Sequence, residues 1–263
     1  MRLAGAALAL CGGCGSAITA SPIEDAGPDV FYVSHQDSGV REDAGVDRVT
    51  PHHDVIVTAP RVLVLYAGKP GVDGAMTQDV FVDWLMASSY WGLLAQYGVG
   101  PGKRVASVQV PLEQLVPVAD QDALGLVGLA TLEKRVHAWV DVNGTMGANA
   151  LLVFLPDTVN VKLSVRGSYT YQTCIDAFGY HAYDGREPYA IMPPCQKGRE
   201  TGSIAHELIE LATDPESNRG WFSNEDLPKG GGEIGDLCQG EQTSWQGWTV
   251  PLMWSNADRH CMP

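Results

Sequence analysis

The chain has 263 residues, which is enough for one well-buried domain with appendages, and a second full domain is not expected. It carries 17 Lys and Arg against 31 Asp and Glu, and the resulting net charge of −14 argues against nucleic acid or an anionic membrane surface as a partner. A hydrophobic content of 45% fits a globular core.

Residues 1–20 predict an export signal. The first ten residues hold one basic side chain and an apolar run too short to cross a bilayer, and small residues follow. Cleavage after Ala20 is one expected outcome. Cys11 and Cys14 leave lipoprotein processing and a lipid anchor open as the other, although neither has a clean lipobox context.

Residues 21–57 predict an acidic linker. The sequence EDAGPD at 24–29 returns as EDAGVD at 42–47, with Ser, Gly and acidic residues between them. Such a composition buries too little apolar surface to offset the entropy lost on ordering, so we expect a disordered tether. The folded domain is therefore predicted to span residues 58–263.

Uninterrupted apolar runs predict buried strands in that domain. They lie at residues 61–67, 105–111, 150–155 and 189–192. The first of these runs, RVLVLYA, is where we expect folding proper to begin.

Segments with helical periodicity stand between these strands. After a turn-rich loop at 68–74, residues 78–97 predict a helix with a broad apolar face, and a second helix is expected over about 122–142. His137 on the second helix is interpreted as a surface or packing residue. The residues of that helix expected to face inward are Leu126, Leu129, Leu132, Val136 and Trp139. The alternation predicts an α/β or α+β core with a mixed sheet.

Residues 203–215 (SIAHELIELATDP) predict a short buried helix. Ser203 or Thr201 is suited to cap its start. Pro215 ends it, because proline disfavours the helical conformation in the residue before it.

This helix carries an HExxE pattern. His206 and Glu210 are four residues apart, so their side chains lie on one face and can grip a single cation. Glu207 lies about 100° round the helix axis. A zinc hydrolase needs this offset, since two ligands hold the metal while the adjacent carboxylate acts as general base on water.

Two alternatives to a zinc site stay open for this pattern. Zinc accepts a carboxylate in place of the second imidazole of HExxH, but so do harder metals such as Ca²⁺. A plain surface ion pair has the same spacing, but the apolar residues around His206 argue against exposure. A buried histidine and two carboxylates are costly without partners, so we expect them to be paired, metal-bound or facing a cleft.

Residues 230–238 (GGGEIGDLC) are expected to supply the third metal ligand. Glu233 and Asp236 both qualify, and we prefer Asp236 because Cys238 beside it would fix the backbone if bridged. Upstream, His181 is expected to line a cleft with Tyr180 and to donate a hydrogen bond to a developing oxyanion. The alternative for His181 is a hydrogen-bonded loop histidine.

Four cysteines remain outside the signal region, and an even number in an exported chain indicates two disulfides with three possible connectivities. We favour Cys174–Cys195 and Cys238–Cys261, because each closes a neighbouring loop. Each would contribute about 3 kcal/mol. A cysteine zinc site is disfavoured, since no CxxC stands in the mature part.

The order of motifs resembles a known family. HELIELATDP at 206–215, GWF at 220–222 and GEIGDLC at 232–238 are similar to secreted, zincin-like bacterial proteins that carry HExxExxTDP followed by EI(G/A)D(L/K)C. The plant phosphate-induced, EXORDIUM-like proteins look like distant relatives. The resemblance covers most of residues 60–263 and implies a zincin-like domain, but not turnover.

We therefore predict an exported, monomeric, zinc-dependent hydrolase that acts on a peptide or protein substrate. His206, Glu210 and Asp236 or Glu233 would hold the metal, and Glu207 would be the general base. The alternative is a non-catalytic cell-envelope or extracellular protein, with an envelope component as partner. In it these residues would hold a structural metal ion or none. A catalytic site should have a cleft beside Glu207, whereas a structural site should be closed.

Overall fold

A computed structural model gives the fold, and the statements below concern the residues that it describes. The predicted signal peptide and most of the predicted linker lie outside these residues. No helix among them is long and apolar enough to cross a membrane. The described residues are 29–30, 49–52, 55–69, 72–164, 170–195, 200–216, 219–223, 232–238 and 241–263.

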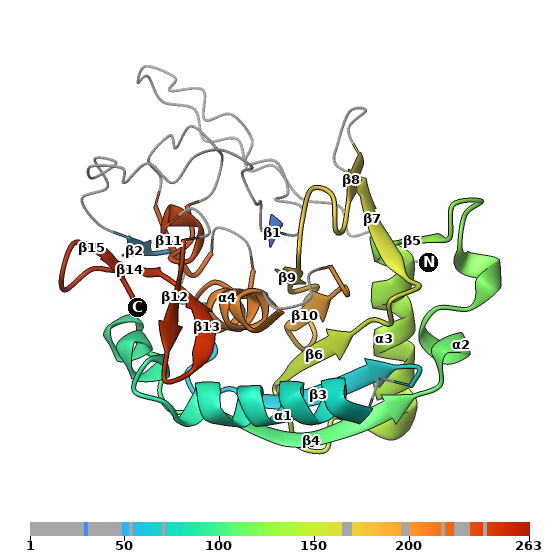
Figure 1. Ribbon diagram of the computed structural model, residues 1–263, viewed down its shortest axis with the longest axis horizontal. Coiled ribbons are helices and arrows are strands. Elements are labelled where there is room, and N and C mark those ends of the chain that lie inside the picture. The colour runs from blue at the N-terminus through green and yellow to red at the C-terminus, as the bar shows by residue number, and fades with distance from the viewer. Residues whose placement is uncertain are drawn as a thin grey trace, which may run out of the picture.

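A mixed six-stranded sheet forms the centre of the domain, in the order β1-β9-β10-β6-β3-β4 (Figure 1). The strands from β10 to β4 are parallel to one another, while β9 is antiparallel to β10 and β1 is antiparallel to β9. This arrangement confirms the predicted fold class, a mixed α/β domain. The strands are β1 (Asp29–Val30), β3 (Arg61–Ala67), β4 (Lys103–Val110), β6 (Ala150–Phe154), β9 (Tyr180–Ala182) and β10 (Tyr189–Met192).

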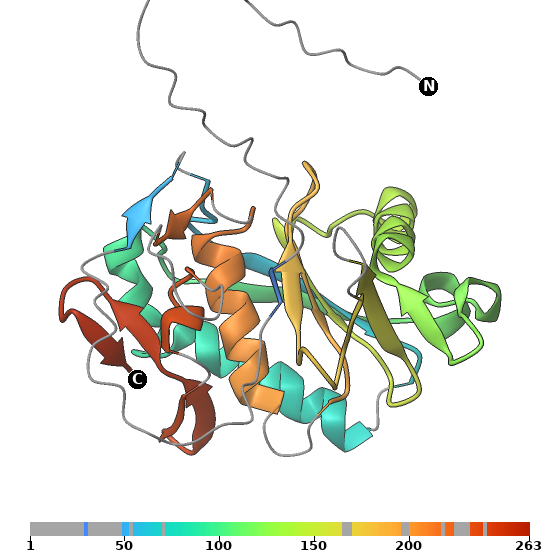
Figure 2. The same ribbon diagram turned by 90° about the horizontal axis from the view of Figure 1, so that it is seen from above.

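Helices cover both faces of this sheet (Figure 2). On one face, α1 (Val72–Ala87) and α4 (Glu200–Thr213) pack against alternate strand residues such as Val62 and Val64. On the other face, α3 (Leu129–Asn143) packs against the intervening strand residues, such as Leu63 and Leu65. Burial on both faces explains why the central strands are continuous apolar runs rather than alternating ones.

The first helix differs from the prediction at both ends. It begins at Val72, inside the predicted loop, and ends at Ala87, and a separate 3-10 helix η1 covers Trp91–Tyr97. The Ser88 hydroxyl donates to the Leu85 carbonyl at 2.7 Å and accepts the Trp91 N–H at 3.1 Å. A serine that bonds to the local backbone in this way competes with helical bonds, which explains the break.

The second predicted helix also starts too early. Residues Leu126–Gly128 form strand β5, which pairs with β7 (Asn160–Ser164), and β7 pairs in turn with β8 (Thr170–Gln172). The Asp122 carboxylate accepts the N–H groups of Leu124 and Leu126 at 2.9 and 3.0 Å and so shapes a turn where the helix was expected. Two short helices precede this turn, α2 (Leu112–Leu115) and η2 (Val118–Asp120).

Helix α4 ends at Thr213, before Pro215, as predicted, but it begins upstream of both predicted caps. Ser203 lies inside the helix. The Thr201 hydroxyl donates to the Thr249 carbonyl in strand β13 (Trp248–Pro251) at 2.8 Å, so it anchors the helix laterally rather than capping it.

The remaining strands form small pairs around α4. Here β12 (Gln242–Trp245) pairs with β13, β14 (Met253–Ser255) pairs with β15 (His260–Met262), and β11 (Trp221–Phe222) pairs with β2 (Thr50–Pro51). Val49 is fully buried beside β2, so ordered contacts begin upstream of residue 61.

The disulfides are the two that we favoured. Cys174 is bonded to Cys195 and Cys238 to Cys261. The first holds the segment that enters β9 against the end of β10. The second holds the 3-10 helix η3 (Asp236–Cys238) against β15.

Candidate metal centre

Helix α4 carries its polar residues into the interior of the protein. Every residue from 202 to 213 is buried, because the helix lies between the sheet and the β12–β13 hairpin. His206 and Glu207 are fully buried and Glu210 is 2% exposed. Charged side chains at such depth need compensating partners, and these come from η3 and β9.

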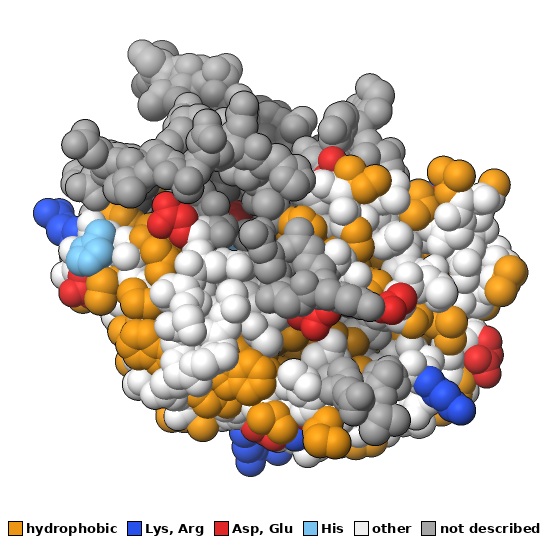
Figure 3. Space-filling model, in the orientation of Figure 1, with side chains coloured by type: hydrophobic (Ala, Val, Ile, Leu, Met, Phe, Trp, Pro, Cys, Tyr) orange, Lys and Arg blue, Asp and Glu red, His pale blue; other side chains and the backbone are white. Residues whose placement is uncertain are grey.

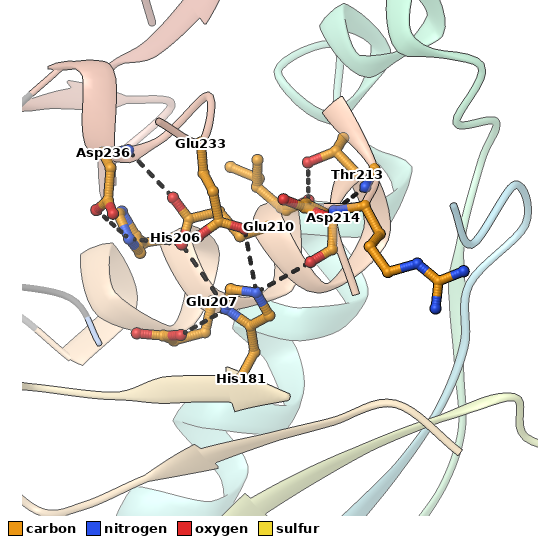
Figure 4. Close-up of polar contacts among 11 residues, drawn as sticks. His181, His206, Glu207, Glu210, Thr213, Asp214, Glu233 and Asp236 are labelled. Carbon is orange, nitrogen blue, oxygen red and sulfur yellow. Dashed lines mark hydrogen bonds and ion pairs between the residues drawn. The ribbon is translucent and has the colours of Figure 1, made fainter. Parts of the chain in front are cut away.

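His206, Glu210 and Asp236 form the first half of the centre (Figure 4). The Nε2 atom of His206 lies 2.8 Å from Glu210 Oε2 and 3.4 Å from Asp236 Oδ1. The other oxygen of Glu210 accepts the Asp236 backbone N–H at 3.1 Å. One ligand atom from each residue lies within 4.8 Å of the other two. The predicted HExxE pair and the preferred third ligand therefore meet at one point.

His181 forms the second half of the centre. Its neighbour Tyr180 points into the core on the α3 side of the sheet, so alternation along β9 turns His181 towards α4. His181 Nδ1 lies 3.3 Å from Glu207 Oε2, and Nε2 lies 3.3 Å from Glu233 Oε1. Of the two candidates for third ligand, Asp236 thus joins His206, whereas Glu233 joins His181.

The hydrogen positions on His181 follow from its partners. Its Nε2 lies 3.2 Å from the Asp214 carbonyl oxygen, which can only accept, so Nε2 carries a hydrogen. The contact between Nδ1 and Glu207 Oε2 is then favourable only if one further proton lies on His181 or on Glu207.

The centre holds more negative than positive charge. It contains four carboxylates and only two imidazoles, so even two protonated imidazoles would not balance the carboxylates if all four were ionised. The carboxylates are Glu207, Glu210, Glu233 and Asp236. All these side chains except that of Asp236, which is 16% exposed, are at most 2% exposed. An uncompensated charge of this size in the interior is strongly unfavourable.

The pKa values of His206 and Glu210 reflect this crowding. Burial by itself would lower the pKa of His206, but the negative charge of Glu210 and the hydrogen bonds to both carboxylates outweigh it and raise the pKa to about 10. Burial raises the pKa of Glu210 to about 7, against the opposing effect of the His206 charge. In the absence of a metal ion, both residues therefore favour the protonated form.

The donor set fits a divalent metal such as zinc. Zinc takes imidazole nitrogen and carboxylate oxygen together, whereas calcium prefers six to eight oxygen ligands. Beside the three donors on His206, Glu210 and Asp236, Glu207 Oε1 is buried and makes no hydrogen bond to the residues described. A doubly charged cation would offset much of the negative charge of these carboxylates.

Two glycines and Asp214 support the centre, and we did not assign them a role from the sequence. A Cβ on Gly179 would lie 2.6 Å from Glu207 Oε1, and one on Gly235 would lie 2.6 Å from Glu210 Oε1. The Asp214 carboxylate accepts the backbone N–H groups of Arg219 and Gly220, which holds the carbonyl that contacts His181. The only signal in the sequence was that Asp214 and Gly235 stand inside the quoted motifs.

Two side chains of the centre are deeply buried. Among the described residues, Glu207 is fully buried and His181 is 1% exposed, so neither side chain reaches the surface. Tyr180, expected beside His181, is buried on the opposite face of the sheet. Figure 3 shows one face of the molecule, where the Lys and Arg side chains of the described residues lie apart from one another near the rim. The described residues of that face form no basic patch.

Comparisons with known proteins identify little. No protein-family model matches the sequence, and no curated protein matches it. Among solved structures, the crystal structure of archaemetzincin from Methanopyrus kandleri matches 57% of this chain and 72% of that chain, with 15% sequence identity and a TM-score of 0.29. We assign no activity from this match.

Proposed function

We propose that the protein is an exported metal-dependent hydrolase, a zinc peptidase, in which His206, Glu210 and Asp236 hold the metal. The observation that supports this most is the convergence of one imidazole nitrogen and two carboxylate oxygens within 4.8 Å inside a site with excess negative charge. Three protein ligands leave a fourth position of a tetrahedral zinc ion for water or substrate.

Glu207 is the proton carrier in this proposal. A bound zinc ion would polarise the substrate carbonyl and make water a stronger nucleophile. Glu207 would accept the proton of the attacking water and pass it to the leaving amine. His181 lies 3.3 Å from Glu207 Oε2 and is also held by Asp214, so we now assign it to orienting Glu207 rather than to an oxyanion.

Export agrees with the two disulfides, which form and persist in oxidising compartments. We propose that the mature protein is extracellular or a cell-envelope lipoprotein and acts as a monomer on a peptide or protein substrate. Its acidic charge disfavours nucleic acid as a partner.

The burial of the centre favours a second candidate function. Because His206, Glu207 and His181 are at most 1% exposed, the same ligands would also suit a structural zinc site in a non-catalytic envelope protein. Such a site would hold α4 to η3 and β9, and its partner would be another envelope component.

Elemental analysis of the oxidised mature chain from an exporting host separates these candidates. We expect the parent to hold zinc, of which His206→Ala loses one equivalent while Glu207→Gln and the exposed control His260→Ala keep it. Under the hydrolase proposal Glu207→Gln also lowers cleavage of an unfolded protein substrate about 10²- to 10⁴-fold. Zinc that depends on His206 with no cleavage by the parent supports the structural candidate. A parent that binds no zinc, even after zinc is added back, rules out both.

A further inference from the structure

A second group of metal-ligand residues lies on the opposite side of the sheet from α4. Glu133 and His137 are four residues apart on α3, and Asp184 lies in the loop between β9 and β10. One ligand atom from each residue lies within 4.8 Å of the other two. Sequence analysis did not predict this group, and we interpreted His137 as a surface or packing residue.

His137 is buried without a hydrogen bond. The residue is 5% exposed, and neither of its ring nitrogens makes a hydrogen bond to the described residues. Its Nε2 lies 3.0 Å from Asp184 Oδ2, so the two groups are in contact although their geometry is not that of a hydrogen bond. A buried polar group left in this state costs free energy, and a cation between the imidazole and the carboxylates would remove that cost.

Glu133 is already oriented for such a cation. Its Oε1 accepts the hydroxyl hydrogen of Tyr189 at 2.7 Å, which leaves the other oxygen for a metal. Burial, reinforced by the charge of Glu133, raises the pKa of Tyr189 well above its usual value, so the hydroxyl stays a donor. The Tyr189 ring also packs edge-on against His137, with 5.9 Å between the centroids. Metal sites commonly have an outer partner that fixes a ligand in this way.

The nearest arginine is engaged elsewhere. Arg186 follows Asp184 in the same loop, but its guanidinium pairs with Asp141 at 2.5 Å. The backbone N–H of Arg186 donates to Asp184 Oδ1 at 3.3 Å, which leaves Asp184 Oδ2 facing His137. The Asp184 side chain is 32% exposed, which leaves the group accessible from solvent.

We propose that Glu133, His137 and Asp184 form a second site for a divalent metal, with zinc as the ion that best suits one imidazole and two carboxylates. The metal would tie α3 to the β9–β10 loop. This site shares no ligand with the centre on α4, so it stands independently of the proposed hydrolase function.

Zinc titration of the full mature chain, read by calorimetry and by competition with a chromophoric chelator, tests the second site. We expect two equivalents in the parent. Asp184→Asn should weaken one of them at least tenfold, as should His137→Ala, while Tyr189→Phe should weaken the same one about tenfold. The control is Asp157→Asn, an exposed carboxylate outside this group, which should change neither equivalent.

The double variant His206→Ala with Asp184→Asn completes the test. If the second site exists, His206→Ala alone keeps one equivalent and the double variant keeps none. Should His206→Ala fail to fold, the comparison of the parent with Asp184→Asn decides alone, because Asp184 lies in an exposed loop. Asp184→Asn that binds zinc with the stoichiometry and affinity of the parent would overturn the proposal.

Discussion

Helices α3 and α4 carry the same pairing of a histidine and a glutamate four residues apart, on opposite faces of one sheet. In α4 the pair His206 and Glu210 is buried with three further carboxylates, whereas in α3 the pair Glu133 and His137 meets only Asp184 from a partly exposed loop. The spacing alone therefore does not define a site. What defines it is the residue that a distant loop brings to the pair, and how far the group lies from solvent.

The largest expected difference between the two helices is the loss in free energy of unfolding when the histidine is replaced by alanine. In the metal-free protein, His206→Ala leaves several buried carboxylates without their cation, so we expect it to lower the free energy of unfolding by about 3–5 kcal/mol. His137→Ala removes a residue with a single carboxylate contact and should cost about 1–3 kcal/mol. Urea unfolding in the presence of a chelator measures both. Equal costs would show that the surroundings of the two histidines do not differ in energy.

The pH dependence of stability should come from the α4 centre. The pKa of His206 is about 10 when folded, against 6.5 when unfolded, so its contribution is complete below 6.5 and is lost as the pH rises through 10. The pKa of Glu210 is raised from 4.5 to about 7, so its contribution is complete below 4.5 and is lost as the pH rises through 7.

Both effects have the same sign, so the metal-free protein should lose stability as the pH rises from 4.5 to about 10, by an amount on the order of a few kcal/mol. Saturating zinc should remove this loss, because the metal replaces the protons. Thermal unfolding across this pH range provides the measurement. His206→Ala should flatten the curve of stability against pH above pH 7, while His260→Ala should leave the curve unchanged. A decline in stability above pH 7 that survives His206→Ala would contradict the assignment.

Smaller effects should follow from glycines that contact the centre. Gly235→Ala puts a methyl group against Glu210 and His206, and we expect a loss of about 1–3 kcal/mol and weaker zinc binding. Gly179→Ala presses on Glu207 instead, so it should lower activity and leave zinc content intact. The control is Gly92→Ala, which has open space and should be neutral or stabilising by about 0.5–1 kcal/mol. If Gly179→Ala expelled the zinc, Glu207 would be a ligand rather than a base.

The smallest effect is expected for an ion pair at the surface near α3. Arg135 on α3 pairs with Asp120 at 2.7 Å, with the arginine side chain 44% exposed. Asp120→Ala should cost no more than about 1 kcal/mol and should fade in high salt. Chemical unfolding at low and high salt measures this, and a larger, salt-independent cost would mean that α3 depends on this pair for its position.

The central strands and the contents of the α4 centre were predictable, because both depend on local pattern. Buried parallel strands are continuous apolar runs, and polar residues within the apolar sequence of α4 stand out against it. Helix ends were less predictable, since Ser88 and Asp122 set them through two hydrogen bonds each to nearby backbone. The β2 and β1 pairings also escaped prediction, because they depend on distant partners.

The α3 group could not be predicted from its spacing. On an amphipathic helix, Glu133 and His137 have the pattern of an ordinary solvent-facing pair, and Asp184 reaches them only through the β9–β10 turn. The deep burial of the α4 centre could not be predicted from the sequence either. A buried polar helix predicts partners, but whether these leave a cleft depends on the packing of segments far apart in the chain.

The Cys238–Cys261 bridge has a consequence for where the protein can work. It joins η3, which carries Asp236, to β15, so the position of the third proposed ligand depends on a bond that thiol reductants can break. His206 and Glu210 sit on one helix and need no such bond. The metal affinity of the α4 centre is therefore expected to follow the redox state of its surroundings, so that the chain matures as a metalloprotein only after it reaches an oxidising compartment.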